Sequence, residues 1–159
     1  MKGYLKAPES TEEAFEGGWF RSGDLATVDE EHYISVKDRK KDIIVTGGEN
    51  VSTVEVEAAI FAHPHVAEAA VVARPHEKWG ETVMAFVVLN HKGQEAYWDE
   101  GPDAFEEELI RFCRARLAGF KLPRVVRLVE ASEGLPKTST GKVQKHVLRD
   151  VARREGSDL

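Results

Sequence analysis

The sequence predicts an α+β protein. Residues 42–159 are expected to form a small three-stranded sheet flanked by helices, and residues 1–41 a short β-rich segment before it. Two observations predict this class. Val66–Ala73 and Thr82–Leu89 are near-continuous apolar runs of strand length, which is typical of central strands. Patterns with helix start and stop signals precede and follow these runs.

The first 41 residues contain patterns of short elements but no core of their own. A short helix is expected at Glu12–Phe15, and the strand candidates are Trp19–Arg21, Leu25–Val28 and Tyr33–Val36. Two or three short strands bury little apolar surface, so this segment is not expected to be self-sufficient.

Lys37–Glu57 combines several local signals within 21 residues. A charged run is followed by the β-branched stretch Ile43–Thr46, which predicts a short strand. Gly47-Gly48 then permits a turn with positive φ, and Ser52-x-x-Glu55 is a capping box that starts a helix running to about Ala62. A solvated surface loop before a hairpin explains the same residues equally well.

The rest of the chain alternates polar loops with one more strand and two more helices. Asn90–Pro102 is predicted to be a loose polar insertion. Asp103–Ala118 should be a helix ended by Gly119, followed by a third strand at Arg124–Val129 and a basic helix at Lys142–Arg154. One face of the first of these helices is apolar and should be buried, namely Phe105, Leu109, Phe112, Cys113 and Leu117.

Composition excludes several classes of protein. The chain has 159 residues, 42% hydrophobic and 31% charged, which suits one globular domain. Its net charge of −6 argues against a general nucleic-acid partner. The single cysteine, Cys113, cannot form an internal disulfide and fits a reducing compartment. Because no apolar run suits a membrane span and no signal region is evident, we expect a cytoplasmic protein.

Three motifs in order resemble those of the adenylate-forming (AMP-binding) enzymes, the superfamily that includes acyl-CoA synthetases. They are WFRSGDL at Trp19–Leu25, the Lys37–Glu57 segment, and PKTSTGKVQK at Pro136–Lys145. The resemblance extends from about Tyr4 to Arg149. It implies that residues 1–41 are the end of a large AMP-binding domain and that residues 42–159 are a mobile C-terminal lid domain.

The resemblance implies the C-terminal part of an ATP-dependent acid–CoA ligase. Such an enzyme converts a carboxylate and ATP to acyl-AMP, and CoA then gives acyl-CoA. The family's ATP-phosphate loop and acyl pocket lie in an N-terminal domain that these residues do not include, so the isolated chain is expected to be inactive. The motifs are most similar to ligases for fatty or aromatic acids. Two alternatives are a non-catalytic CoA-binding or lid module, and a complementing partner of a separate N-terminal chain.

Lys142 is the candidate catalytic residue. It follows the small polar loop Thr138–Gly141, which can present a long cationic side chain to another domain. The pattern is not an ATP P-loop, since Pro136 replaces the first glycine and Val143 the magnesium-binding hydroxyl. By resemblance Lys142 is the adenylation lysine, whose ammonium stabilises the charge that develops when a carboxylate attacks a phosphate. The alternative is an ordinary surface lysine.

Two further sets of residues are implied by the same resemblance. Asp24 and Arg39 match the pair that binds the ribose of ATP, although each considered alone is typical of a turn or a surface. Lys41 falls at the family's hinge, and the end of a charged run suits a residue that absorbs a φ/ψ change. Magnesium is expected to arrive with ATP and to be held outside this chain.

The resemblance also implies contacts with CoA. Gly47, Gly48 and Glu49 match the loop that lines the tunnel for its pantetheine arm. The rings of Trp79 and Phe120 would stack on its adenine, and Lys121 and Arg124 would meet its phosphates. Leu122 stands where some relatives carry a basic residue, which weakens the phosphate contact. Trp79 and Phe120 are equally consistent with covers on the edge of the core. His63 and His65 lack a third ligand in sequence and are interpreted as structural.

Overall fold

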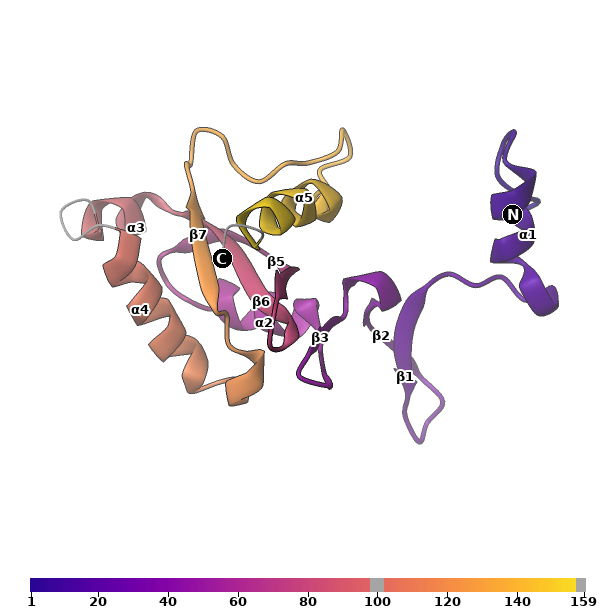
Figure 1. The fold of residues 1–159 in the computed structure, drawn as a ribbon, viewed down its shortest axis with the longest axis horizontal. Coiled ribbons are helices and arrows are strands. Elements are labelled where there is room, and N and C mark those ends of the chain that lie inside the picture. The colour runs from indigo at the N-terminus through magenta and orange to yellow at the C-terminus, as the bar shows by residue number, and fades with distance from the viewer. Residues whose placement is uncertain (98–101, 157–159) are drawn as a thin grey trace. The chain divides into compact units, whose positions relative to one another are not determined.

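A computed structural model describes residues 1–97 and 102–156. The chain divides into two compact units, Met1–Lys41 and Asp42–Leu159 (Figure 1). The 3₁₀ turn η2, Lys40–Asp42, connects them.

The first unit is one short helix followed by a hairpin. Its elements are α1 (Pro8–Ala14), the 3₁₀ turn η1 (Glu16–Gly18), β1 (Asp24–Val28) and β2 (Ile34–Arg39). The strands pair antiparallel, with Asp24 opposite Arg39. The two later strand candidates are thus confirmed, with ends that differ from the predicted ones by at most three residues. The candidate at Trp19–Arg21 was wrong: these residues form no strand.

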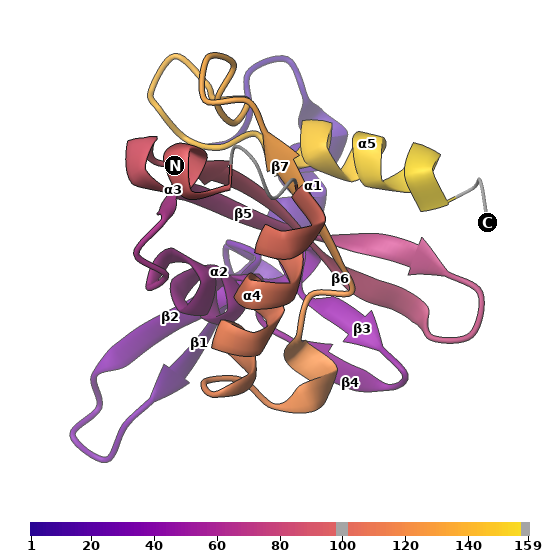
Figure 2. The same ribbon diagram turned by 90° about the vertical axis from the view of Figure 1, so that its left-hand side faces the viewer.

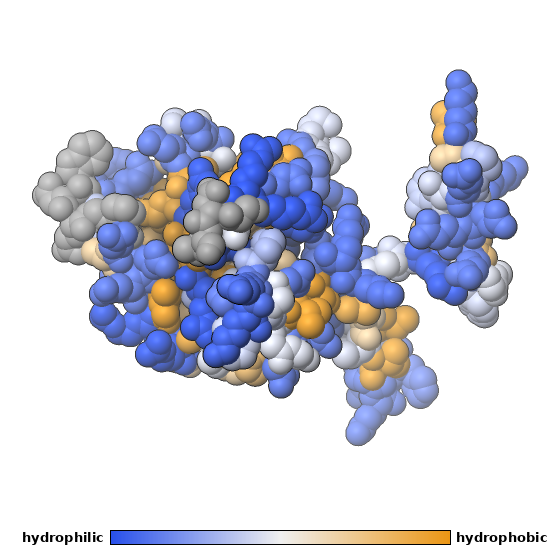
Figure 3. All heavy atoms as spheres, viewed as in Figure 1, coloured by the Kyte–Doolittle hydropathy of each residue, from blue (hydrophilic) through white to orange (hydrophobic). Residues whose placement is uncertain are grey.

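The first unit has no hydrophobic core among its described residues. Every residue of β1 is exposed, and in β2 only Asp38 is buried. Large apolar or aromatic side chains therefore lie on its surface, namely Leu25, Val28, Tyr33, Ile34 and Val36. Figure 3 shows hydrophobic residues exposed in this part of the chain. A two-stranded hairpin with this little burial is only marginally stable by itself.

The second unit is built on a mixed sheet centred on β6 (Gly80–Leu89). The strand β5 (Val66–His76) pairs antiparallel along one side of β6. On the other side, β7 (Val125–Val129) pairs parallel with the second half of β6, and β3 (Ile44–Thr46) meets its first residue. The three predicted strands are all present.

The sheet contains two strands beyond the predicted three because Ile44–Val51 folds into a hairpin that joins it. The first of them is the short strand predicted at Ile43–Thr46, and only the second was not predicted. In this hairpin β3 pairs with β4 (Glu49–Val51). Gly47 and Gly48 form its turn with φ of +59° and +90°. Two successive residues with positive φ are what a tight two-residue turn requires, and glycine adopts them at little cost.

Helices cover both faces of the sheet. They are α2 (Thr53–Phe61), α3 (His91–Ala96), α4 (Pro102–Arg114) and α5 (Lys145–Gly156), with a 3₁₀ turn η3 (Gly119–Lys121) before β7. None of the described helices has both the length and the hydrophobicity needed to span a bilayer.

Two expectations about helices were wrong in part. The stretch predicted as a loose insertion contains α3, because the Asn90 side chain caps it by accepting from the Gly93 N–H at 3.0 Å. Residues 98–101 of that stretch lie outside the described residues. The helix predicted to reach Ala118 ends at Arg114, and a turn follows in which the Leu117 N–H donates to the Cys113 carbonyl.

The core is two apolar layers separated by the sheet. Val71, Val83, Ala85 and Val87 point toward α2 and α4, and the intervening residues point toward α5. Figures 1 and 2 show α4 and α5 on opposite sides of the strands. The predicted apolar face of α4 is buried at four positions, whereas Phe112 is only partly buried; the four are Phe105, Leu109, Cys113 and Leu117.

Candidate functional site

Lys142 lies at the tip of a tight loop between β7 and α5. The backbone N–H of Thr138 donates to the Lys142 carbonyl at 2.8 Å, and the Lys142 N–H donates to the Thr138 hydroxyl at 3.2 Å. Gly141, with φ of +81°, closes the turn. Lys142 is exposed, and within residues 1–97 and 102–156 its ammonium has neither an ion pair nor a hydrogen bond.

The stem of this loop is fixed to the body of the second unit. Lys137 forms a β-bridge with Val143, and its ammonium contacts Glu68 of β5 at 2.6 Å. The Gln144 N–H donates to the Pro136 carbonyl at 2.8 Å. The fold therefore presents one unpaired cation on a well-anchored support.

Asp24 and Arg39 are brought together by the register of the β1–β2 hairpin. Arg39 Nε lies 3.4 Å from Asp24 Oδ1, and both side chains are exposed. Arg39 also lines a surface hollow with Ser22, Gly23 and Lys41. An exposed carboxylate beside a guanidinium offers acceptors and donors together, which suits a vicinal diol such as ribose.

Lys41 is the last residue of the first unit and lies in the 3₁₀ turn η2. It is exposed, whereas the next side chain, that of Asp42, is only 11% exposed and is ion-paired within the second unit. At the boundary between the two units, the exposed side chain of Lys41 is therefore followed directly by the ion-paired side chain of Asp42.

Gly47 and Trp79 are in direct contact. The Gly47 N–H donates to the Trp79 carbonyl at 3.0 Å, and a Cβ built on Gly47 would lie 2.8 Å from Trp79 Cε3. The ring is 40% exposed, and Lys78 Nζ lies 4.9 Å from its centroid. Gly48 and Glu49, in the same turn and strand, are exposed beside it. The glycine backbone of this turn, the partly exposed ring of Trp79 and the ammonium of Lys78 therefore lie next to one another.

Phe120, Lys121 and Arg124 form a separate group in and after η3. Phe120 is 41% exposed, and Arg124 is exposed. Lys121 is already paired, since its ammonium contacts both oxygens of Glu55 at 2.7 and 2.8 Å. No ring contact, hydrogen bond or ion pair among the described residues joins this group to Trp79.

Comparison with known proteins decides the family. The model of the AMP-binding enzyme C-terminal domain matches residues 55–142, which is more than half of the chain. The chain belongs to the AMP-binding enzymes. The resemblance inferred from the three motifs is thereby confirmed.

The relatives of this AMP-binding chain are acid–CoA ligases. Over 156 residues it is 47% identical to the peroxisomal acetate/butyrate–CoA ligase AAE7 of Arabidopsis thaliana, covering 98% of the chain and 26% of the relative. It is 49% identical to the 2-methylpropanoate–CoA ligase CCL4 of Humulus lupulus, and this match covers 99% of the chain and 27% of the relative. The chain spans about a quarter of the length of these curated relatives.

A solved AMP-binding enzyme has the same fold. The ATP-bound structure of MatB from Rhodopseudomonas palustris superposes with a TM-score of 0.80 at 38% identity, covering 98% of this chain and 29% of that one. The predicted fold class, a small mixed α/β unit with the architecture of the family's C-terminal domain, is confirmed.

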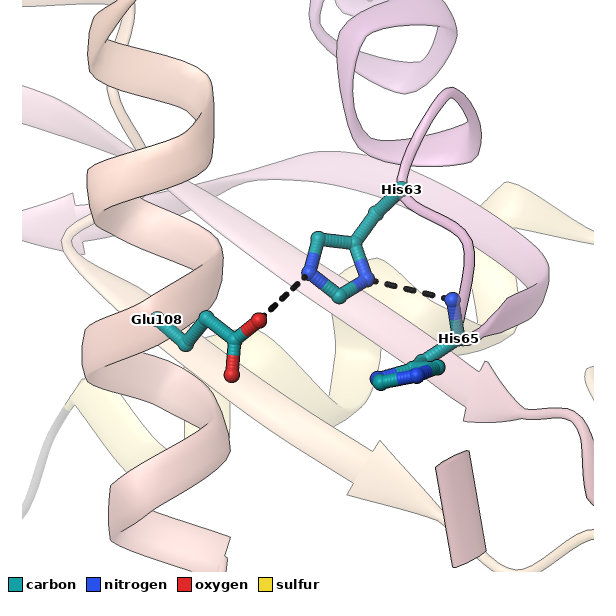
Figure 4. Close-up of side chains that lie close together, drawn as sticks. All are labelled: His63, His65 and Glu108. Atoms are coloured by element: carbon teal, nitrogen blue, oxygen red, sulfur yellow. Dashed lines mark hydrogen bonds and ion pairs between the residues drawn. The ribbon is translucent and has the colours of Figure 1, made fainter. Parts of the chain in front are cut away.

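Sequence reasoning on the AMP-binding chain named His63 and His65 but missed the residue that they meet, Glu108. His63 and His65, which follow α2, meet Glu108 of α4, and a potential ligand atom from each lies within 4.8 Å of the others (Figure 4). His63 Nε2 lies 3.3 Å from Glu108 Oε1, and the Tyr97 hydroxyl donates to the same carboxylate. No local pattern points to Glu108, because the contact depends on how α4 packs.

Hydrogen bonding explains the positions of His63 and Glu108 without a metal ion, whereas the buried Nδ1 of His65 has no hydrogen-bond partner among the described residues. His63 Nδ1 accepts from the His65 N–H at 3.3 Å, so the proton of the neutral ring is on Nε2, which donates to Glu108. If His63 bound a metal ion through Nε2, its ring proton would have to be on Nδ1. That proton would face the His65 N–H, and the hydrogen bond between them would be lost. Burial lowers the pKa of His63 against the opposing effect of Glu108, and the Tyr97 hydroxyl lowers the pKa of Glu108. We infer that the cluster joins α2 to α4.

Proposed function

We propose that the chain is the C-terminal part of an ATP-dependent acid–CoA ligase. In the first step a substrate carboxylate oxygen attacks the α-phosphorus of ATP and pyrophosphate leaves. In the second step the CoA thiolate attacks the acyl carbon of the adenylate and AMP leaves. The observation that carries the proposal is the exposed, unpaired ammonium of Lys142 on its anchored loop.

Lys142 would act in the first step alone. The attacking carboxylate and the α-phosphate are both anions, and negative charge spreads over the phosphate oxygens as the new bond forms. An ammonium bridging the two groups stabilises that charge, and the loss of one such preorganised donor typically costs about 10²–10³ in rate. Since no carboxylate within residues 1–97 and 102–156 holds Lys142, no ion pair with these residues has to be broken before its side chain can bind the nucleotide.

The first unit and the hinge would serve the same step. Asp24 and Arg39 would bind the ribose hydroxyls, their pairing in the hairpin register holding both side chains ready. Lys41 would be the pivot about which the second unit rotates between the two half-reactions, since it lies at the unit boundary with an exposed side chain. Mg²⁺ would enter with ATP, on ligands outside this chain.

The second step would use the surface around Trp79. Gly47, Gly48 and Glu49 would let the pantetheine arm pass along bare backbone, and the half-exposed Trp79 ring would offer a stacking face for adenine. Phe120 and Arg124 would extend this surface. Lys121 would first have to leave Glu55, so we assign it a smaller part than Arg124.

The proposed partner is a large N-terminal AMP-binding domain, in the same chain or a separate one. The apolar side chains exposed on the first unit support this, because they need a covering surface. By itself the chain is proposed to be inactive, and ATP–pyrophosphate exchange by the isolated chain would refute this. We propose a short aliphatic or aromatic acid as substrate and a cytoplasmic location, with the peroxisome of the Arabidopsis relative as the alternative.

The test measures the half-reactions separately in the full-length ligase. Lys142→Ala should reduce ATP–pyrophosphate exchange by about 10²–10³. It should leave thioester formation from supplied acyl-adenylate within a few-fold of wild type. Lys92→Ala, which removes another exposed lysine in α3, is the control and should change neither. An equal loss of both half-reactions in the Lys142 variant would refute the assignment.

A further inference from the structure

The first side chain of the second unit is held by the helix that follows the Lys142 loop. Asp42 Oδ1 lies 2.5 Å from Arg149 Nη1 of α5. The two side chains are only 11% and 20% exposed, whereas those of the neighbouring pair Arg153–Asp150 are 65% and 55% exposed. A partly buried charge pair is screened less by solvent than a surface pair, and it becomes costly to break on one side only.

A second charged contact fixes the same helix one turn earlier. Lys145 Nζ contacts Glu57 Oε1 at 2.7 Å and donates to Thr53 Oγ1 at 2.7 Å, both in α2. Glu57 in turn accepts from the backbone N–H of Val71, on the outer edge of β5, at 2.8 Å. Lys145 on the polar face of α5 is thus bonded to α2 around the edge of the sheet formed by β5, while Leu148 and Ala152 of α5 pack against the sheet.

These contacts connect two distant points of the sequence. Lys142 lies three residues before the start of α5, which contains Arg149, and its loop is anchored at Lys137. Asp42 directly follows Lys41. A rotation at Lys41 is passed to the Lys142 loop through the sheet that Ile44 enters, and most directly where the residue after the pivot is itself joined to α5.

We propose that Asp42 and Arg149 are positioning residues that make α5 and its preceding loop rotate as one body with the chain leaving the hinge. The inference rests on the proposed function, in which Lys41 is the pivot and Lys142 the adenylation lysine. The ion pair acts through Lys142 and touches no substrate. Without it the backbone at Asp42 has rotational slack, which displaces Lys142 from its place in the first step.

The test uses the full-length ligase with Asp42→Asn and Arg149→Met. Misplacement of a positioned group by about 1 Å can cost 10²-fold, so adenylation kcat should fall about 10–100-fold with the KM for ATP within twofold. The matched control is Arg127→Met, which breaks the ion pair between Arg127 and Glu155 at the other end of α5. When its Tm is lowered as much as in the Asp42 and Arg149 variants, this control should still leave the kcat of adenylation unchanged. If it lowers kcat as much, the pair has only a structural role.

Combination with Lys142→Ala separates positioning from destabilisation. If Asp42 acts through Lys142, adding Asp42→Asn to Lys142→Ala should cause no further loss of adenylation. A further loss equal to that in the wild-type background would overturn the inference. A different result would refute the proposed function itself, namely a Lys142→Ala variant that keeps its full rate of adenylation. Asp42→Glu, which keeps the charge, should recover most of the rate lost in Asp42→Asn.

Discussion

Substituting the two glycines of the β3–β4 turn one at a time should give unequal effects. Both have positive φ, at +59° for Gly47 and +90° for Gly48, so alanine is strained at either position. Only at Gly47 would the added Cβ meet another group, Trp79 Cε3, at 2.8 Å; at Gly48 it meets nothing within 4 Å. Gly48→Ala therefore measures the backbone strain, and Gly47→Ala measures strain together with the displacement of the Trp79 ring.

The expected magnitudes follow from these contacts. A left-handed conformation costs a residue with a Cβ about 1–2 kcal/mol, so Gly48→Ala should lower the free energy of unfolding by that amount. Overpacking typically adds about 1–3 kcal/mol. Because the Trp79 ring is 40% exposed and can tilt outward, we expect the low end of this range. Gly47→Ala should thus cost about 1 kcal/mol more than Gly48→Ala.

Denaturant unfolding measures both free energies, and tryptophan fluorescence reports the ring itself. The other tryptophans, Trp19 and Trp98, are replaced by phenylalanine in every variant so that Trp79 is the sole emitter. Gly47→Ala should shift its native emission, and Gly48→Ala should not. Equal losses of stability with unchanged emission in both variants would refute the contact between Gly47 and Trp79. In the full-length ligase, the same displacement should raise the KM for CoA.

Three further predictions concern the second unit. Ser52→Ala removes the acceptor for the Glu55 N–H and should lower the free energy of unfolding by about 1 kcal/mol, whereas Ser52→Asp should not; equal losses would contradict the cap. Burial raises the pKa of the Cys113 thiol to about 11, so at pH 8 its thiolate fraction should be about a hundredfold smaller than for an ordinary thiol. Iodoacetamide should therefore label Cys113 only after unfolding, and rapid labelling of the folded chain would contradict this burial. Because burial lowers the pKa of His63, its stabilising contribution is complete above the ordinary value of 6.5 and is lost as the pH falls through the lower folded value. Thermal unfolding between pH 7 and 5 should show this decline, and a His63→Gln variant with the same decline would exclude His63 as its source.

Features encoded locally were predictable from sequence. The Ser52 cap and the apolar runs of β5 and β6 depend only on neighbouring residues and on the period of the pattern, and the structure confirms them. The short helix α3 was not predicted. It has six residues, too few to show a helical period, and only the Asn90 cap marks its start.

Pairings between distant residues could not be predicted. His63 meets Glu108 across 45 positions, and Lys121 meets Glu55 across 66, because α4 and η3 pack beside α2. The second pairing changes the interpretation of a site residue. A lysine predicted to be available for CoA phosphates has an internal carboxylate partner, and no property of its own sequence neighbourhood shows this.

The pairing of charges in the second unit explains why Lys142 stands apart from other basic residues near it. Five basic residues of β7, η3, α5 and the loop stem hold internal carboxylates: Lys121 with Glu55, Arg127 with Glu155, Lys137 with Glu68, Lys145 with Glu57 and Arg149 with Asp42. Each must give up a partner before it can bind an external anion. Lys142 gives up only water, so its full Coulombic attraction is available to a nucleotide. The surrounding ion pairs keep the support of Lys142 rigid, so that its ammonium is presented from a fixed loop.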